Sequence, residues 1–206
     1  MDGPRILAGF VQGTLAAVSA QDAALGERIR ARLAPATRER LARASRIAWV
    51  ALELDVELTH AIYAELGPVR ARELFRRNLS GALDSPVLRS LAQGALRLFG
   101  ASPARLFGWA PKVYAQLYRD AGEMRFALDA PGSARLELHA LPPAVATSRS
   151  YLDGMAAAVA AGFDLMGVKG EVRLESHEPA AARARFRLEW DEDGGGEQSL
   201  PLCARA

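Results

Sequence analysis

The sequence of 206 residues predicts an α+β fold, in which an N-terminal helical block packs on one face of a four-stranded antiparallel sheet. Three observations lead to this prediction. Apolar residues recur three and four positions apart through most of the first half, which is helical spacing. Four later segments alternate apolar and polar residues, and a helical segment separates the second from the third. The expected order is therefore helices-β-β-α-β-β, in a single ligand-binding-like domain of residues 1–190.

Residues 1–83 are expected to be mostly helical. Asp55 is the predicted cap of one helix, and Gly67-Pro68 is the predicted stop of the same helix. Two apolar runs are left open. Residues 6–11 form either a first strand or a strap across the core, and residues 47–54 form either an extended segment or a buried turn. The predicted helices cover residues 15–33, 35–44, 56–66 and 69–83.

Residues 84–129 are the stretch around which the other elements are expected to pack. Residues 85–100 combine a Ser-Pro start, one broad apolar face and a terminal glycine, so they predict a buried helix. The helical pattern resumes after Ser102-Pro103. It divides just before Pro111, because a proline ring clashes with the preceding turn of a continuous helix.

Gly122 is the expected left-handed end of this helical region, and four amphipathic strands follow it. The first strand is predicted to place Met124, Phe126 and Leu128 on its apolar face. The opposite face of the sheet alternates arginine and glutamate and is predicted to be solvated. Residues 191–206 are acidic and glycine-rich, and we expect a disordered tail there. The predicted strands cover residues 123–129, 134–139, 171–175 and 183–190, with a helix from Ser148 or Ser150 to Gly167 between the second and third.

Charge and composition argue against several classes of protein. The formal net charge is only +2. Arginines gather between residues 28 and 46, but glutamates interrupt them, so solvated helix faces are favoured over a nucleic-acid surface. No apolar run reaches the roughly 18 residues of a membrane-spanning helix. The start of the chain lacks the pattern of a signal peptide, and Cys203 has no cysteine partner. We therefore expect a cytoplasmic protein without nucleic-acid partners.

The sequence contains no catalytic or metal-binding pattern. His60, His139 and His177 lie far apart in the chain, and the latter two are expected on the solvated face of the sheet. The sequence has no nucleophile elbow, and its only glycine run lies in the acidic tail, which would repel phosphate. We therefore predict no enzymatic activity, no metal and no cofactor.

Large apolar residues in the helical half are the best candidates for a ligand site, because such sites are mostly apolar with a few polar groups. The same residues also suit an ordinary core, and on the surface they would instead suit a protein partner. The candidates are Trp49, Phe75, Leu91, Trp109 and Tyr114, with Tyr118 beside them.

Four features carry a family resemblance: Trp49 in the run IAWVALEL, an arginine- and leucine-rich helix before a proline, the run YRDAGEMRF, and the terminal F-x-L-x-W of Phe186, Leu188 and Trp190. Through these the chain resembles a paralogous family of myxobacterial proteins. More distantly it is similar to 4-vinyl-reductase-type domains, haem-dependent nitric-oxide sensor domains and subunits of the TRAPP tethering complex. The resemblance implies an α+β ligand-binding fold with helices on one face of an antiparallel sheet.

The chain departs from these relatives at the residues that carry their chemistry. Ser176 and Ala184 stand where the vinyl-reductase type often has two cysteines. The tyrosine–serine–arginine element and helical histidine of the haem sensors are not found, so haem is not expected. The resemblance thus implies a non-enzymatic sensory or regulatory domain that binds a small apolar ligand. The alternative is a homodimeric interaction scaffold, and an enzyme related to vinyl reductases rests on analogy of fold alone.

Overall fold

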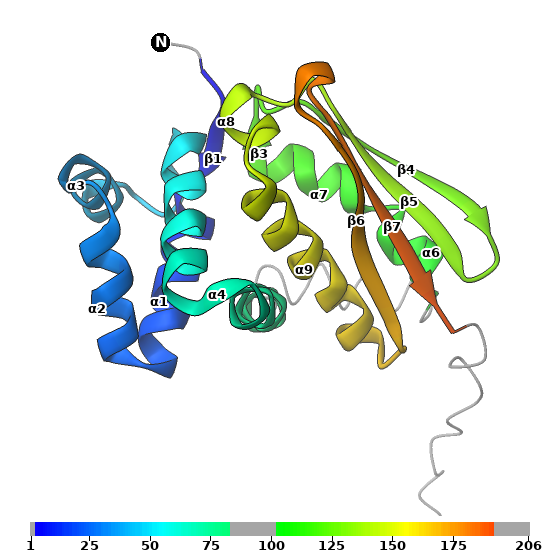
Figure 1. Ribbon diagram of the computed structural model, residues 1–206, viewed down its shortest axis with the longest axis horizontal. Helices are drawn as coiled ribbons and strands as arrows, with labels where there is room; N and C mark the ends of the chain where they lie inside the picture. Colours follow the sequence, from blue (N-terminus) through cyan, green and yellow to red (C-terminus); the bar gives the residue numbers. More distant parts are fainter. Residues whose placement is uncertain (1–2, 83–101, 192–206) are drawn as a thin grey trace, which may run out of the picture.

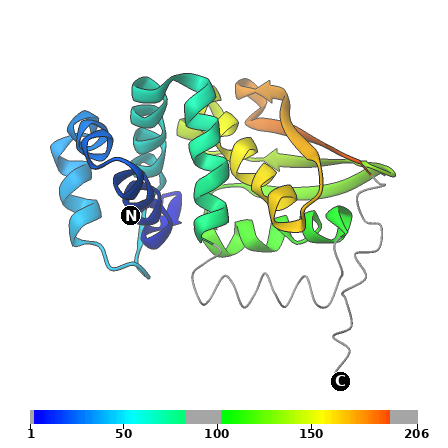
Figure 2. The ribbon, with the colours of Figure 1, turned by 90° about the horizontal axis from the view of Figure 1, so that it is seen from below.

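The computed structural model describes residues 3–82 and 102–191, and it confirms the α+β prediction. Three N-terminal helices lie at one end of the molecule and a four-stranded sheet at the other (Figure 1). Helices α4 (Leu52–Ala82) and α9 (Arg149–Met166) lie between them (Figures 1 and 2). The predicted helix at residues 85–100 and the tail from residue 192 fall outside the described residues.

A small antiparallel sheet that the sequence did not predict holds the N-terminal half together. Its strands are β1 (Arg5–Leu7), β2 (Trp49–Ala51) and β3 (Tyr118–Arg119), in the order β2-β1-β3. Strands of two or three residues are too short to show an alternating pattern. Because β3 belongs to the second half of the sequence, whereas β1 and β2 belong to the first, this sheet joins the N-terminal helices to the second half of the protein.

The N-terminal helices are α1 (Ala8–Gln21), α2 (Ala23–Arg32) and α3 (Pro35–Arg43). The open run at residues 6–11 proves to be a strand that passes directly into a helix. The predicted single helix over residues 15–33 is wrong in one respect, because it breaks at Asp22. The side chain of Asp22 accepts a hydrogen bond of 3.0 Å from the Leu25 amide and so caps α2.

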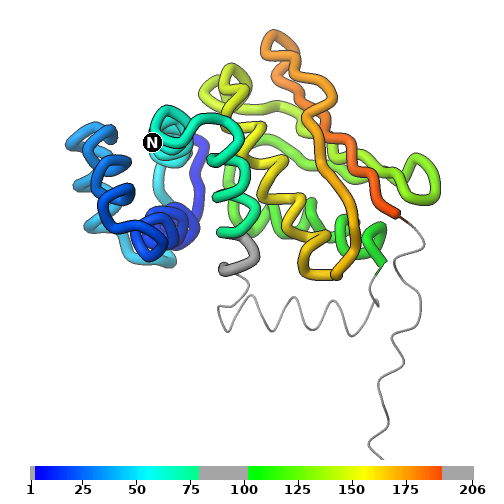
Figure 3. The backbone as a smooth tube through the Cα atoms, turned by 60° about the horizontal axis from the view of Figure 1, so that its bottom comes forward, coloured from blue at the N-terminus to red at the C-terminus, as the bar shows by residue number. Residues whose placement is uncertain are grey.

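Helix α4 begins at Leu52 and is kinked at Gly67, whose φ and ψ are 71° and 169°. The predicted stop at Gly67-Pro68 is therefore a bend between two helical halves, which Figures 2 and 3 show joined by a turn. The prediction that Asp55 caps a helix is wrong. Because the helix starts three residues earlier, Asp55 lies within its first turn and its side chain is directed into the interior.

The predicted division before Pro111 is confirmed by α6 (Pro103–Phe107) and α7 (Ala110–Leu117). Gly122 has a φ of 90°, as expected for a left-handed glycine, but it does not end a helix. It follows β3 instead, and an added Cβ there would lie 2.3 Å from the His139 carbonyl oxygen. A close backbone approach and the positive φ together explain why this position is glycine.

The large sheet has the antiparallel strand order β4-β5-β7-β6. Its strands are β4 (Glu123–Ala130), β5 (Ser133–His139), β6 (Gly170–Glu178) and β7 (Arg183–Trp190). Leu128 is an error of the sequence prediction, since it is 55% exposed next to a register shift in β4. The apolar face is otherwise as predicted, and its fully buried residues are Ala134, Leu136, Leu138, Val172, Ala184, Phe186 and Leu188.

Helix α9 lies on the apolar face of the sheet and forms the centre of the molecule (Figure 1). Its predicted limits are confirmed, with Ser148 as N-cap and Gly167 as left-handed C-cap. Two of its glycines admit aromatic rings from other helices. Added Cβ atoms would lie 3.2 Å from the Phe75 ring at Gly154 and 2.8 Å from the Phe107 ring at Gly162.

Short helices complete the second half, namely α8 (Pro143–Ala146) before α9 and the 3₁₀ turn η1 (Pro179–Ala181) between β6 and β7. Across the two described ranges, no helix is both long enough and apolar enough to cross a bilayer.

Candidate functional site

A buried group of one carboxyl and three tyrosines, the Asp55 cluster, lies where α4, α9, β3 and α7 meet. The Tyr151 hydroxyl donates a hydrogen bond of 2.7 Å to Oδ2 of Asp55. The Tyr118 hydroxyl lies 3.3 Å from that of Tyr151. The Tyr118 ring stacks on Tyr114 at 4.4 Å between centroids, and the Tyr114 hydroxyl donates to the Ala121 carbonyl at 2.8 Å. The cluster therefore links residues that are up to 96 positions apart in the chain.

Local structure fixes the position of each member of the cluster. Asp55 lies in the first turn of α4, where the helix dipole favours a negative charge. Tyr151 lies in the first turn of α9, and its amide donates 3.2 Å to the capping Ser148 hydroxyl. Tyr118 pairs with Ile6 in the small sheet, directly after the end of α7. Two helix starts and one strand thus bring three polar side chains together inside an apolar region.

Burial controls the protonation of the cluster. Asp55 is only 5% exposed, and burial raises the pKa of its carboxyl to about 6, while the hydrogen bond from Tyr151 opposes that rise. Burial first, and then the charge of Asp55, raise the pKa of Tyr151 and of Tyr118 well above the ordinary tyrosine range. The tyrosines therefore stay neutral, and Asp55 is the member whose charge changes near neutral pH.

Polar contacts between α4 and α9 extend away from the cluster in both halves of α4. His60 Nε2 lies 2.6 Å from the Ser148 hydroxyl. Asp153 accepts hydrogen bonds from the Tyr63 hydroxyl at 3.2 Å and from Arg72 at 2.7 Å. The last of these contacts is a bidentate pair, in which the Arg76 guanidinium donates hydrogen bonds of 2.7 and 2.6 Å to the two carboxylate oxygens of Asp164. These contacts help to fix how α4 lies on α9.

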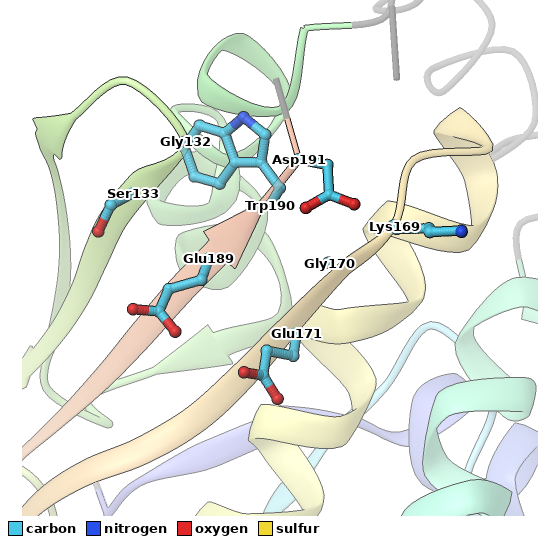
Figure 4. Close-up of a pocket in the computed structure, with 8 residues that line it drawn as sticks. All are labelled: Gly132, Ser133, Lys169, Gly170, Glu171, Glu189, Trp190 and Asp191. Carbon is cyan, nitrogen blue, oxygen red and sulfur yellow. The ribbon is translucent and has the colours of Figure 1, made fainter. Parts of the chain in front are cut away.

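A second feature is an open pocket of about 430 Å³ at one end of the large sheet (Figure 4). The Glu171 and Glu189 carboxylates point away from the Trp190 indole, in keeping with the alternation of side chains along a strand. Arg173 and Arg187 pair with these two carboxylates. Four of the pocket's lining side chains are charged, which does not suit an apolar ligand, and the lining consists of Gly132, Ser133, Lys169, Gly170, Glu171, Glu189, Trp190 and Asp191.

All three histidines of the sequence lie within the described residues. His60 is exposed apart from its contact with Ser148. His139 lies on the outer face of the sheet, 3.4 Å from the Glu137 carboxylate, as predicted. His177 was predicted on the same face, which is wrong. A register shift between Leu174 and Ser176 turns it inward, and its Nε2 lies 2.6 Å from the Ala146 carbonyl oxygen.

The predicted ligand-site residues lie on separate elements. Trp49, on β2, has the Arg119 guanidinium 4.0 Å from its ring centroid. Phe75, on α4, packs against Gly154 of α9. Trp109 precedes α7, is 37% exposed and lies 4.5 Å from the Lys112 ammonium.

Two predicted residues remain. Tyr114 belongs to the Asp55 cluster, whereas Leu91 lies outside the described residues. The pocket of Figure 4 contains none of the four described candidates, so the ligand site stays a prediction.

The sequence analysis missed Asp55 and Tyr151 as site residues. Asp55 was assigned to a helix cap, and because Glu53 and Glu57 flank it, the local sequence does not indicate that this carboxyl alone is buried. Tyr151 is buried on the inner side of α9, but no local pattern indicates that it meets Asp55. Among the described residues, no three His, Cys, Asp or Glu side chains are arranged to hold a metal ion.

Comparisons with known proteins show which fold this is. No protein-family model matches the chain, and no curated protein matches it. An Fe(II) unliganded H-NOX protein mutant from K. algicida is similar in structure, with a TM-score of 0.62, 12% identity and coverage of 90% of this chain and 97% of the other.

Two further H-NOX structures are similar to the same degree. An H-NOX protein from S. oneidensis in the Fe(II)NO ligation state gives a TM-score of 0.60 at 11% identity, over 89% and 98% of the two chains. An oxygen-binding H-NOX domain related to soluble guanylate cyclases gives 0.59 at 10% identity, over 95% and 100%. At these identities the likeness establishes the fold alone, which is H-NOX-like.

Proposed function

We propose that the chain is a non-enzymatic sensory or regulatory domain that binds a small apolar ligand between its helices and its sheet. One observation carries the proposal, namely the H-NOX-like fold across about nine-tenths of this chain and nearly the whole of the compared proteins. Two of the similar H-NOX structures are an oxygen complex and an Fe(II)NO state, and oxygen and nitric oxide are both small and weakly polar molecules. A fold of this kind supports a ligand-sensing role for this chain by analogy.

The donor atoms of this chain do not fit a histidine-ligated haem. Haem iron is held by an axial histidine, cysteine, methionine or tyrosine that faces a pocket. His60 is exposed, His139 lies on the outer face of the sheet, and His177 is held at the Ala146 carbonyl. The hydroxyls of the buried tyrosines already lie in the Asp55 cluster. We therefore infer that the ligand is recognised by apolar contact and not through a haem iron.

The proposed ligand contacts are the predicted residues Trp49, Phe75, Leu91, Trp109 and Tyr114. Among these, Tyr114 has the closest link to a buried polar group, because it stacks on Tyr118 of the Asp55 cluster. An apolar ligand near Tyr114 would thus have one polar cluster at its edge, as ligand sites commonly do.

Homodimerisation stays a prediction, as do the cytoplasmic setting, the absence of nucleic-acid partners and the relation to a myxobacterial family. Of the large exposed hydrophobic residues in the described part, Trp109 and Val113 lie one turn apart at the start of α7, the other three lie on separate segments, and none of them selects a dimer face. They are Ile47, Val69, Trp109, Val113 and Leu128.

Thermal unfolding of the full chain with decanoic acid, indole or hemin tests the proposal. A ligand present at about a hundred times its Kd stabilises the native state by about 2.7 kcal/mol, which is a readily measured rise in Tm. We expect decanoic acid or indole to raise Tm, and the rise to shrink in Phe75→Ala relative to the surface control Val69→Ala. Absence of any rise with both apolar probes, or a rise with hemin alone, would contradict the proposal.

A further inference from the structure

We propose that the Asp55 cluster is a proton-controlled joint between the N-terminal half of the protein and the half formed by α9 and the large sheet. The inference goes beyond the proposed function and does not depend on any ligand. It concerns the free energy of the contact that α4 makes with α9 and β3, and how pH changes that free energy.

The position of the cluster is what makes it a joint. Asp55 belongs to α4, Tyr151 to α9, and Tyr118 to the strand β3 that pairs with β1. One carboxyl therefore lies at the contact of three segments that are distant in sequence. The second half of α4 is bound to α9 separately, by exposed and partly exposed ion pairs such as Arg72 with Asp153. The buried contact at Asp55 is thus the part of the interface in which a single proton has the largest effect.

The groups that face Asp55 are neutral. Tyr151 reaches it from α9, Tyr118 approaches from β3, and Tyr114 of α7 lies behind Tyr118. The opposing effects on its pKa are burial and the Tyr151 hydrogen bond, and no cation enters among them.

Three charged or titratable groups on α4, β1 and β3 have other partners. Arg5 of β1 lies 4.0 Å from Asp120, and Arg119 of β3 stacks on Trp49. His60, one turn further along α4, lies against Ser148. Within residues 3–82 and 102–191, an ionised Asp55 would therefore be a buried charge without a counter-charge, which is costly unless water or a cation reaches it.

Protonation of Asp55 consequently favours the closed form, in which α4, α9 and β3 are in contact at the cluster. Ionisation favours the open form, in which this contact is broken. The carboxyl titrates at about pH 6 in the closed form, against 3.8 for a solvated aspartate. The closed form thus binds the proton more tightly than the open form does. By linkage, the opening constant rises about tenfold per pH unit between the two values and levels off above the higher one.

Amide hydrogen exchange of the full chain, corrected for the intrinsic effect of pH, tests this inference between pH 4.5 and 7. We expect the amides of residues 118–121 and 149–153 to exchange through an opening of lower free energy than the amides of β5 and β7. Their opening constant should rise about tenfold per pH unit up to pH 6 and then stay level. In Asp55→Asn, which keeps the shape but cannot ionise, this dependence should vanish. The matched control Asp153→Asn, on α9 outside the cluster, should keep it.

Tyr151→Phe provides a second and independent measurement. Because the Tyr151 hydroxyl stabilises the ionised carboxyl, its loss should move the midpoint of Asp55 to higher pH, as followed by the ¹³Cγ chemical shift of that residue. The inference is overturned if Asp55 titrates like a solvated aspartate, or if Tyr151→Phe leaves its midpoint unmoved. It is also overturned if Asp55→Asn keeps the pH dependence, or if the cluster amides exchange only together with the sheet. Should Asp55→Asn fail to fold, the midpoint in Tyr151→Phe decides alone.

Discussion

At the scale of single residues, Asp55 is the least expected feature of the molecule. Its carboxyl is buried, it accepts a hydrogen bond from the Tyr151 hydroxyl, and no cation among the described residues affects its pKa. Such a residue is unfavourable for folding at neutral pH, since the folded state must either ionise it in a poor solvent or keep its proton. Groups of this kind are more frequent at functional sites than elsewhere.

The stability of the protein should therefore depend on pH in a defined direction. The pKa of Asp55 is raised from 3.8 to about 6 on folding, so its stabilising effect is complete below pH 4 and is lost as the pH rises through 6. The total loss is about 3 kcal/mol by the linkage relation. Urea unfolding at pH 4.5 and 6.5 should show about 2 kcal/mol of this fall in the wild type and a smaller fall in Asp55→Asn. Equal falls in both proteins would mean that Asp55 does not titrate as described.

Gly162 should be intolerant of even one added methyl group. A Cβ at this position would lie 2.8 Å from Cε1 of the Phe107 ring, which is itself in edge contact with Phe163 at 4.7 Å between centroids. We expect Gly162→Ala to lower the free energy of unfolding by about 1–3 kcal/mol through overpacking.

The matched control for that variant is Gly13→Ala in α1, where a Cβ would meet nothing within 4 Å. Alanine there should raise stability by about 0.5–1 kcal/mol, because glycine is a poor helix former. Chemical denaturation of the two variants checks both signs. A stable Gly162→Ala protein would show that Phe107 moves aside freely.

At the scale of elements, α4 is the connection on which the arrangement depends. Its first half carries Asp55 and His60, and its second half carries Phe75 and Arg76 across α9. The kink at Gly67 lets one chain segment contact α9 in both halves. The φ and ψ of Gly67 fall in a region that residues with a side chain hardly occupy.

Replacing Gly67 by alanine should therefore strain the kink. We expect Gly67→Ala to cost about 1–3 kcal/mol of stability, although no atom crowds the added methyl group. Urea unfolding followed by circular dichroism provides the measurement. An unchanged stability together with a higher helix content would indicate that α4 straightens without loss, contrary to this account.

Element prediction from the sequence succeeded where the pattern is local. Leu136 and Leu138 alternate cleanly and lie on the buried face, and Ser148 and Gly167 bound α9 as expected. Leu128 and His177 were misplaced because bulges shift the register, and a bulge leaves no trace in the alternation itself. The strands β1 to β3 are too short for any period.

The candidate site was predicted less well than the fold, for a physical reason. The hydrogen bond from Tyr151 to Asp55 joins residues 96 positions apart, and only the folded chain brings them together. Tyr114 was selected for its aromatic ring alone, and its place beside Tyr118 was not foreseen. Asp55 itself was assigned to a cap because an aspartate that caps a helix and an aspartate buried in its first turn have the same local sequence pattern.

At the scale of the whole molecule, the chain combines an H-NOX-like fold with an interior that offers no free axial histidine. Its halves meet at a cluster controlled by one proton, and its large sheet keeps an outer face of paired arginines and glutamates. Pairs such as Arg187 with Glu189 are exposed and contribute little to stability. The proposed ligand site would therefore lie in the interior between α4, α9 and the sheet.

Native mass spectrometry of the full chain, purified from cells supplied with a haem precursor, tests whether the protein binds a small apolar molecule and not haem. We predict a non-covalent adduct of a small apolar molecule, with no haem adduct and no Soret absorption in the same sample. A haem adduct, or the bare mass of the chain in every preparation, would contradict it.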